Sequence, residues 1–347
     1  MSVLYKAVQW NRHKLIYDAI LLVSVVLYVL LFISVTKWLH TDLDLRALRI
    51  RAYGSAAFIL LHVILSIGPL TRLNPRFFPL LYNRRHMGVT MFLLGLYHAR
   101  LALMWYHNFG NLDPMVSLFL SNTHYDSFIR FPFEILGLLA LPILFLMAAT
   151  SHDFWLVNLT APVWKALHMG VYLAYGLLVG HVVLGALQTN KDLFLSIIVG
   201  LGLFWIVGVH LAAAIRESSL DHQALAVGKD GFIDVGSVTE IPERRAKIVS
   251  IGGERVAVFR YDGKISAVSN VCQHQNGPLG EGKIVEGCIT CPWHGYQYLP
   301  DSGTSPPPFT EKIPTFAVKL QGERIFVKAV PNPAGTQVAP AVIGEGV

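Results

Sequence analysis

Long apolar runs, separated by short polar segments, dominate the first two thirds of the chain. At about 1.5 Å per helical residue, runs of this length suit a hydrocarbon layer of about 30 Å. The runs lie at residues 15–36, 53–70, 87–106, 132–150, 161–187 and 193–215. The first run exceeds the apolar core of a signal peptide, and we interpret it as a retained anchor. The pattern therefore predicts a bundle of six membrane-spanning helices over residues 15–216, after a basic lead at residues 1–14.

The pattern changes abruptly after residue 216. Residues 217–230 are polar and are expected to form a linker, and shorter runs rich in Val and Ile follow. These runs lie at residues 232–238, 246–251, 255–260, 264–268, 315–320 and 324–328, with turns expected at Gly252-Gly253 and Asp262-Gly263. They predict a small all-β domain over residues 231–330. Residues 331–347 are rich in Pro, Gly and Ala and are expected to be a flexible tail.

The composition agrees with a membrane protein. Hydrophobic residues make up 53% of the chain and charged residues only 14%, whereas roughly 25% of residues are charged in soluble proteins. The net charge of +6 comes from basic residues that lie between apolar runs, as topology-setting charges do. We therefore predict the lipid bilayer as a partner and no nucleic acid.

The basic residues of the loops predict the orientation. With six spans both chain ends lie on one side, which then holds nine basic residues against six on the other. The nine are Lys6, Arg12, Lys14, Arg72, Arg76, Arg84, Arg85, Lys165 and Arg216, and the six are Lys37, Arg46, Arg49, Arg51, Arg130 and Lys191. The excess predicts a multi-pass protein of the inner (cytoplasmic) membrane, with the β domain in the cytoplasm.

Cysteine and histidine residues are paired in two short segments of the predicted β domain. Cys272-Gln273-His274 is followed, after sixteen residues, by Cys291-Pro292-Trp293-His294. In the Rieske arrangement, a two-iron, two-sulfur cluster takes cysteines on one iron and two histidines on the other. A Cys-x2-Cys formed by Cys288 and Cys291 is also compatible with zinc or a thioredoxin-like pair, but neither explains both halves. We predict a packed strand thiol at Cys288. The predicted ligands of a [2Fe-2S] cluster are Cys272, His274, Cys291 and His294.

Histidines within the apolar spans are functional candidates, because ionisable groups are costly there. Neutral imidazole is an axial ligand of haem iron, and helical bundles hold cofactors between facing helices. Spans three and five run parallel, so His98 and His181 are predicted to ligate one haem. His168 lies 13 residues before His181, which predicts a second haem about 20 Å closer to the cytoplasm. The competing interpretation, a histidine that only forms hydrogen bonds across helices, is preferred for His210.

The other ligand of the second haem has two candidates. His86 lies 12 residues before His98 and suits the depth of that haem, although it lies at the membrane edge beside two arginines. His62, in span two, is the alternative. Thirteen residues on an ideal helix leave two side chains about 140° apart. Two arrangements would resolve this difference: a distortion of span five at Gly170, Gly176 and Gly180, or a ligand from His62.

The helical part of the chain resembles a known family. Residues 53–187 resemble the ferric reductase-like transmembrane domain shared by ferric reductases, NADPH oxidases and the haem-binding membrane subunit of the bacterial periplasmic methionine sulfoxide reductase system. The similarity rests on Gly68-Pro69-Leu70-Thr71-Arg72, on Arg84-Arg85-His86-Met87-Gly88 before His98, and on Leu167-His168 before His181. It implies one or two haems b, held by His98, His168 and His181, and electron passage across the membrane. His62 and His86 do not map cleanly onto its pattern.

The β domain resembles a second family. Residues 232–328 are similar to Rieske ferredoxins and to the Rieske domains of ring-hydroxylating oxygenases, through the two Cys/His segments. Respiratory Rieske proteins carry an additional cysteine pair where this chain has Gly277 and Trp293, so no disulfide is expected. The resemblance also places Tyr296 where high-potential members have a serine. It places Tyr298 where a tyrosine bonds a ligand cysteine sulfur.

Together these features predict a membrane electron-transfer oxidoreductase, in which a Rieske cluster exchanges single electrons with a cytoplasmic partner and with intramembrane haem. No Gly-rich dinucleotide fingerprint follows a strand, so a separate redox partner is expected, such as a flavin reductase or a ferredoxin, and the acceptor is unknown. Two alternatives stand: a Rieske ferredoxin-like component of an oxygenase system, and a non-catalytic haem-binding membrane sensor. All predicted site residues are cofactor ligands, and none is assigned a catalytic role.

Overall fold

The structure of the protein is a computed structural model, which describes most of the chain. The described residues are 12–81, 84–151, 155, 159, 161–189, 193–221, 228, 230–274, 277–292 and 295–344. They form two compact units. One contains residues 12–68 and 84–210, and the other contains residues 69–81 and 211–344.

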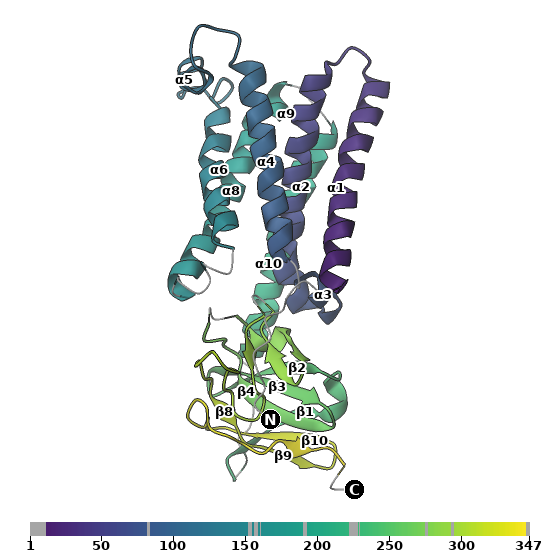
Figure 1. Cartoon of the computed structure of the whole chain (residues 1–347), viewed down its shortest axis with the longest axis vertical. Helices are drawn as coiled ribbons and strands as arrows, with labels where there is room; N and C mark the ends of the chain where they lie inside the picture. The colour runs from purple at the N-terminus through teal and green to yellow at the C-terminus, as the bar shows by residue number, and fades with distance from the viewer. Residues whose placement is uncertain are drawn as a thin grey trace. The chain divides into compact units, whose positions relative to one another are not determined.

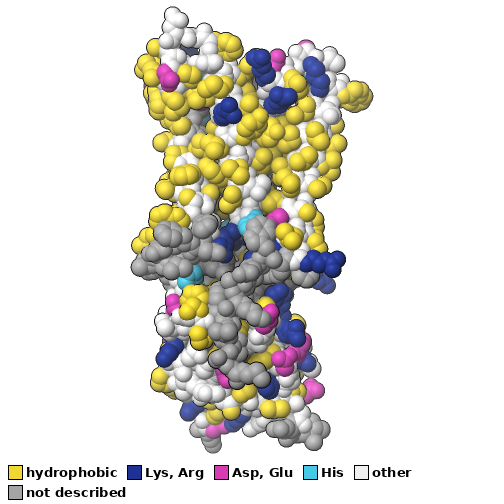
Figure 2. All heavy atoms as spheres, viewed as in Figure 1, with side chains coloured by type: hydrophobic (Ala, Val, Ile, Leu, Met, Phe, Trp, Pro, Cys, Tyr) yellow, Lys and Arg dark blue, Asp and Glu magenta, His cyan; other side chains and the backbone are white. Residues whose placement is uncertain are grey.

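The first unit is built from long apolar helices (Figure 1). The helices of the described chain are α1 (Arg12–Leu39), α2 (Leu45–Leu73), α3 (Phe78–Leu81), α4 (Arg84–Tyr106), α5 (Pro114–Leu120), α6 (Glu134–Ala149), α8 (Ala161–Leu184), α9 (Ala186–Thr189) and α10 (Leu193–Asp221). Hydrophobic side chains cover the visible flank of this bundle (Figure 2). Such a surface suits contact with lipid tails, and the chain is a multi-pass membrane protein.

Five helices in the described chain are long and apolar enough to cross a membrane, one fewer than the six predicted spans. They cover Lys14–Leu39, Leu45–Leu73, Arg84–Tyr106, Ala166–Gln188 and Leu195–Ser219. The fourth predicted run forms α6, which begins only after Phe133 and ends before Thr150. Its 16 residues give a helix of about 24 Å, shorter than the hydrocarbon layer. Figure 1 shows α6 alongside α4 and α8, and it contacts both.

Glycines bring α6 and α8 close together. A Cβ built on Gly180 would lie 3.0 Å from Leu136 Cδ1, and one on Gly170 would lie 3.2 Å from Ile143 Cγ2. Small residues allow such close approach of membrane helices. The glycines of span five were expected to permit a distortion, but α8 continues as one α-helix through Gly170, Gly176 and Gly180. At Gly170 and Gly180 the absence of a side chain serves the packing against α6.

The second unit contains the β domain, whose sheets are antiparallel. The described strands are β1 (Phe232–Ser237), β2 (Arg245–Ile251), β3 (Glu254–Tyr261), β4 (Lys264–Ser269), β5 (Lys283–Val285), β6 (Cys288–Thr290), β7 (Gln297–Tyr298), β8 (Thr315–Phe316), β9 (Val318–Gln321), β10 (Arg324–Lys328) and β11 (Ala341–Val342). They form the sheets β1-β10-β9, β11-β4-β3-β2 with β8 also on β4, and β5-β6-β7. Five of the six predicted runs each form one strand, whereas the run at residues 315–320 is divided between β8 and β9, which lie in different sheets. Both predicted hairpin turns adopt positive φ, as two-residue type I′ turns require.

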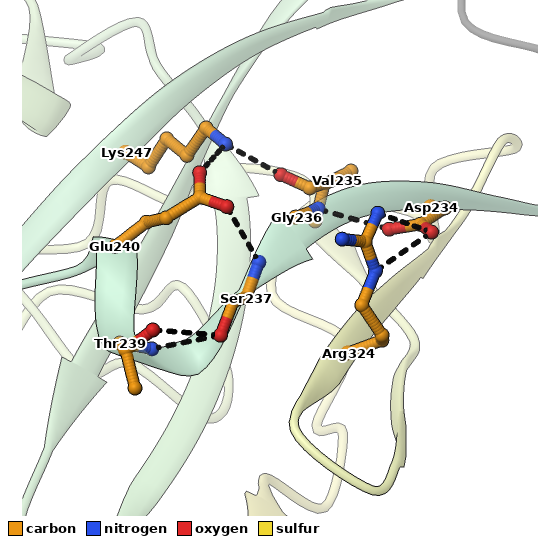
Figure 3. Close-up of polar contacts among 8 residues, drawn as sticks. All are labelled: Asp234, Val235, Gly236, Ser237, Thr239, Glu240, Lys247 and Arg324. Atoms are coloured by element: carbon orange, nitrogen blue, oxygen red, sulfur yellow. Dashed lines mark hydrogen bonds and ion pairs between the residues drawn. The ribbon is translucent and has the colours of Figure 1, made fainter.

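Polar contacts fix the entry to the β domain (Figure 3). Arg324 donates to the Asp234 carboxylate from Nε at 3.0 Å and from Nη2 at 2.6 Å. Lys247 Nζ lies 2.5 Å from Glu240 Oε2, and the Ser237 N–H donates to Glu240 Oε1 at 3.0 Å. Ser237 and Glu240 form a capping box, which satisfies backbone donors at the start of a short 3₁₀ helix.

The segment after residue 330 is not the flexible tail that its composition predicts. β11 pairs with β4, with Ala341 opposite Ile265. The Val338 N–H donates to the Asp301 carbonyl at 2.7 Å, and the Ile343 N–H donates to the Gly263 carbonyl at 2.8 Å. Because these bonds pair backbone groups along the edge of a sheet, they hold the segment in place. The expectation of a flexible tail is therefore wrong for residues 331–344.

Two apolar clusters form the core of the β domain. One packs β1, β2 and β10 around Ile241, Val256 and Ile325. The other contains Phe259, Leu279 and Ile289, together with Cys272 and Cys291. The second apolar cluster therefore packs against both predicted ligand segments through their cysteines.

Candidate functional site

The first predicted ligand segment follows strand β4. The Cys272 N–H donates to the Gly277 carbonyl at 2.9 Å, and Val271 bridges to Pro278. Asn270, just before them, accepts the Gly280 N–H on its side chain at 2.6 Å. These bonds close a tight loop, so the buried Cys272 thiol is held at a fixed place.

The second predicted ligand segment is the loop between β6 and β7. The Cys291 N–H donates to the Tyr296 carbonyl at 2.8 Å, and the Gly295 N–H donates to the Cys291 carbonyl at 2.9 Å. Gly295 has a φ of +75°, a conformation that glycine adopts without strain. The fourth predicted ligand, His294, lies outside the described residues.

Tyr298 connects the second loop to the first. Its hydroxyl lies 3.5 Å from Cys272 Sγ and accepts the Gln273 N–H at 3.0 Å. Burial, and then the neighbouring Cys272, raise the pKa of Tyr298 far above its ordinary value of 10.0. The hydroxyl therefore stays protonated, and its hydrogen is available to the sulfur. This is the tyrosine-to-cysteine bond that the family resemblance implies.

The cysteines have the chemistry that a two-iron cluster requires. Cys272 and Cys291 are buried, and neither is in a disulfide. Among the described residues, no three His, Cys, Asp or Glu side chains gather around a single metal position. A two-iron cluster does not require such a group, because each iron takes only two protein ligands. Cys288 lies in β6 and is buried, and burial raises its pKa, as expected for a packed strand thiol.

His98 of α4 and His181 of α8 lie together inside the helical bundle. Their ring centroids are 6.2 Å apart and their planes are nearly perpendicular, at 87°. His98 Nδ1 lies 2.8 Å from the Ile50 carbonyl, and His181 Nδ1 lies 2.9 Å from the Phe133 carbonyl. With Nδ1 as the donor, Nε2 of each neutral ring carries the lone pair that a metal requires.

Glycines on neighbouring helices make room for these two rings. A Cβ built on Gly54 of α2 would lie 2.8 Å from the His98 ring. One built on Gly137 of α6 would lie 3.0 Å from His181 Nδ1. A side chain at Gly54 would displace the His98 ring, and one at Gly137 would crowd the His181 ring.

His168, further along α8, is held differently. Its Nδ1 lies 3.0 Å from the Trp164 carbonyl, one helical turn before it, and its ring stacks on the Trp164 indole at 3.8 Å between centroids. Its Nε2 is buried and has no hydrogen-bond partner in the part of the chain that the structure describes. A buried acceptor of this kind suits a metal ion.

The two candidate partners of His168 have different surroundings. His86 Nδ1 lies 2.7 Å from Asp18 Oδ2, so a carboxylate holds one ring nitrogen. His62 uses both ring nitrogens, because Nδ1 lies 2.8 Å from the Phe58 carbonyl and Nε2 accepts the Tyr175 hydroxyl at 3.0 Å. A Cβ on Gly202 of α10 would also collide with His62. His62 of α2 therefore forms a hydrogen bond to α8 and packs closely against α10.

Sequence reasoning missed a buried polar group at residue 107. His107 lies just after the third predicted span and is not among the predicted ligands, but it is buried. Its Nδ1 lies 3.1 Å from Ser117 Oγ, and its Nε2 lies 3.3 Å from Glu134 Oε2. These contacts attach α5 to the start of α6. Only the polar Glu134 at the start of an apolar run signalled this contact. His210 Nε2 pairs with the Tyr172 hydroxyl at 3.1 Å, the cross-helix bond preferred for it.

Comparison with protein families matches both parts of the chain. The family model of the Rieske [2Fe-2S] domain matches residues 231–317. The family model of the ferric reductase like transmembrane component matches residues 53–179.

Individual relatives match about a quarter of the chain. The naphthalene 1,2-dioxygenase system ferredoxin component of Pseudomonas aeruginosa is 30% identical over 97 residues, 28% of this chain and 93% of that protein. Cholesterol 7-desaturase nvd 1 of Ciona intestinalis is 37% identical over 90 residues, 25% of this chain, and the chain spans only 19% of its length. Among solved structures, the ferredoxin of carbazole 1,9a-dioxygenase from Nocardioides aromaticivorans IC177 is 22% identical, with a TM-score of 0.27, over 28% of this chain and 98% of that one.

Proposed function

We infer that this protein is a membrane electron carrier. The chain belongs to the ferric reductase-like transmembrane family over residues 53–179 and to the Rieske [2Fe-2S] family over residues 231–317. It exchanges single electrons between a cytoplasmic redox partner, a Rieske cluster and b-type haem within the membrane. The cofactors, when bound, supply the one-electron chemistry. The residues of the chain hold them, orient them and exclude water.

The pairing of His98 with His181 carries this proposal. Two metal–imidazole bonds of about 2 Å, together with the radii of two imidazole rings, span about 6 Å, and the ring centroids lie 6.2 Å apart. Each Nδ1 is held by a backbone carbonyl, the usual arrangement for metal-ligating histidine. Glycines leave the space that the rings occupy. His98 and His181 would therefore hold one haem b.

His168 and His86 are the ligands that we assign to a second haem b. The buried Nε2 of His168 supports one side. Asp18 supports the other, because a carboxylate on Nδ1 raises the basicity of a metal-ligating imidazole. His62 is the weaker candidate, since Tyr175 and Phe58 occupy both of its ring nitrogens.

Cys272, His274, Cys291 and His294 are the ligands that we assign to the cluster. The buried thiols of the two loops supply the cysteine ligands of one iron, and the histidines serve the other. The Tyr298 hydroxyl lies 3.5 Å from Cys272 Sγ, and with the cluster bound it would donate to the Cys272 thiolate and stabilise the extra negative charge of the reduced state.

With α6 counted as a sixth, shorter crossing, both chain ends lie on one side, and the excess of basic residues in the loops of that side supports a cytoplasmic β domain and an inner-membrane location. A flavin reductase or a ferredoxin is the class of partner we propose. A reporter protein fused to the C-terminus tests the orientation. Activity of a cytoplasmic reporter is expected, and activity of a reporter that works only in the periplasm would reverse the proposed side.

Reduction by dithionite, followed by optical and EPR spectroscopy of the purified chain, tests the function. We expect b-haem absorption bands together with the EPR signal of a reduced Rieske cluster. Addition of a one-electron acceptor should then return both the haem and the cluster to their oxidised spectra. A preparation with the cluster signal and no haem would contradict the proposal and favour a ferredoxin-like role.

A further inference from the structure

Tyr296 lies between the two predicted ligand loops of the β domain. It belongs to the second loop, just before β7, and its ring stacks on that of His274, which belongs to the first loop. The ring centroids are 4.8 Å apart and the planes are only 7° from parallel. Tyr296 thus joins the two loops through the face of a predicted ligand.

Several groups fix the Tyr296 ring. Its hydroxyl donates to the Glu311 carboxylate, and the Phe309 ring meets it edge-on at 5.0 Å between centroids. Its carbonyl accepts the Cys291 N–H at 2.8 Å, so its backbone is tied to the second loop as well. The side chain is buried. A ring anchored at its hydroxyl, its edge and its backbone has little freedom to rotate.

No covalent bond can fulfil this role here. The chain has three cysteines, and none of them is in a disulfide. Apart from the ligand bonds of a bound cluster, the described contacts that join the first loop to the second are therefore noncovalent. Tyr298 supplies one such contact, at Cys272 and Gln273, but it does not touch the His274 ring in any contact described.

We propose that Tyr296 is a positioning residue, which holds the His274 imidazole in one plane at its iron and takes the place of a covalent brace between the loops. Glu311 acts through Tyr296 by anchoring its hydroxyl. The ring plane of a ligating imidazole affects the electronic structure of the metal, and partners of metal ligands set both affinity and potential. The inference rests on the cluster being bound and does not depend on haem.

Substitutions in the full chain test this role. Tyr296→Leu removes the aromatic face, Tyr296→Phe keeps the stack but loses the anchor, and Glu311→Gln weakens the anchor. Tyr261→Phe is the matched control, because Tyr261 is a buried tyrosine of the same apolar cluster whose hydroxyl bonds Ser266 at 2.8 Å. The readouts are the EPR spectrum of the reduced cluster, its midpoint potential and the rate of cluster loss at fixed temperature.

We expect Tyr296→Leu to broaden the EPR lines, to shift the midpoint potential, and to speed cluster loss by about tenfold or more, the range for partners of metal ligands. Tyr296→Phe and Glu311→Gln should change the same quantities in the same direction by less, and Tyr261→Phe should match the wild type.

The proposal would be overturned if Tyr296→Leu had the EPR spectrum, the midpoint potential and the rate of cluster loss of the wild type. If Tyr296→Leu binds no cluster, Tyr296→Phe and Glu311→Gln test the proposal instead. Wild-type EPR spectra, midpoint potentials and rates of cluster loss in both of these variants would then overturn the proposal. Failure of the haem assignment would leave these EPR results unchanged, so the two proposals fail separately.

Discussion

His98 and His181 come from helices α4 and α8, yet their imidazole rings lie 6.2 Å apart with planes at 87°. Both rings are fixed by backbone carbonyls, at Ile50 and Phe133, that belong to other segments of the bundle. The pair is therefore preorganised by the fold, which reduces the cost of ordering the rings when a metal-bound cofactor enters.

The first prediction concerns this pair. His98→Ala and His181→Ala should each remove the same haem, because an iron that needs two axial imidazoles loses its site when either is absent. Haem per protein, measured from the absorption of the purified variants, should fall by the same amount in both and no further in the double variant. A loss in only one of the two would contradict the pairing.

The second prediction uses the space around His98. Gly54→Ala would place a Cβ 2.8 Å from the His98 ring, so the ring must move and haem content should fall. Gly95→Ala is the matched control, since Gly95 lies on α4 with His98 and nothing lies within 4 Å of its Cβ position. Absorption spectra of the two variants measure the difference. Equal haem content in both would show that the Gly54 contact is unimportant.

The third prediction separates His86 from His62. His86→Ala should lose one haem, whereas His62→Ala should keep its haem and lower the thermal stability of the chain, because it leaves the buried Tyr175 hydroxyl without its acceptor. Asp18→Asn should weaken haem retention by about tenfold, as loss of a carboxylate partner does for metal-ligating histidine. Haem-to-protein ratios and melting curves measure these effects. Haem loss in His62→Ala with none in His86→Ala would exchange the two assignments.

Much of the β domain could be predicted from the sequence. Strands β3 and β4 have eight and six residues and are separated by the turn at Asp262-Gly263. Their apolar runs were therefore long enough to predict two strands from the sequence. In the hairpin that carries the second ligand loop, only the strand at Cys288 was predicted, and the bounds of β6 and β7 were not, because these strands have only three and two residues. Alternation of polar and apolar residues has no meaning over so short a span.

The surroundings of the histidines could not be predicted. The meeting of His98 and His181 followed from their depths in two spans, but the groups that hold their rings are 48 residues away along the chain. Asp18, which pairs with His86, lies 68 residues before it. Such contacts depend on which helices become neighbours and how they rotate, and one sequence does not contain that information in its local pattern.

The fourth prediction concerns pH and the β domain. The hydrogen bonds that Arg324 donates to Asp234 lower the pKa of that carboxyl below 3.8. The pair therefore adds stability that is present above about pH 4 and is lost as the pH falls through the folded-state pKa. Asp234→Asn should lower the free energy of unfolding at pH 7 by at most about 1 kcal/mol, because the pair is exposed. The difference should shrink below about pH 4.

Thermal melts of the β-domain signal between pH 3 and pH 8 measure this difference. Asp262→Asn is the control, since its carboxylate lies 4.0 Å from Arg244 with both side chains largely exposed, and it should match the wild type throughout. A difference between Asp234→Asn and the wild type that grows toward acid would have the wrong sign.

The fifth prediction concerns the potential of the cluster, for which Rieske centres span about −150 to +300 mV. Hydrogen bonds to the sulfurs raise it, because they stabilise the added negative charge of the reduced state. Tyr296, at the position of the serine in high-potential relatives, instead donates its hydroxyl to Glu311. The Tyr298 hydroxyl lies 3.5 Å from Cys272 Sγ, a predicted ligand sulfur. We therefore expect a midpoint in the lower half of the range, suited to a flavin reductase and unfavourable for a ubiquinol donor.

An EPR-monitored redox titration of the full chain measures this midpoint, and Tyr298→Phe tests its cause. Removing one hydrogen bond of about 1 kcal/mol should lower a one-electron potential by about 40 mV. Tyr261→Phe, which loses a hydroxyl bonded only to Ser266 in the contacts described, should leave the potential unchanged. A wild-type midpoint near +300 mV would contradict the argument, because sulfur hydrogen bonds beyond that of Tyr298 would then be required, and a quinol would become the favoured donor.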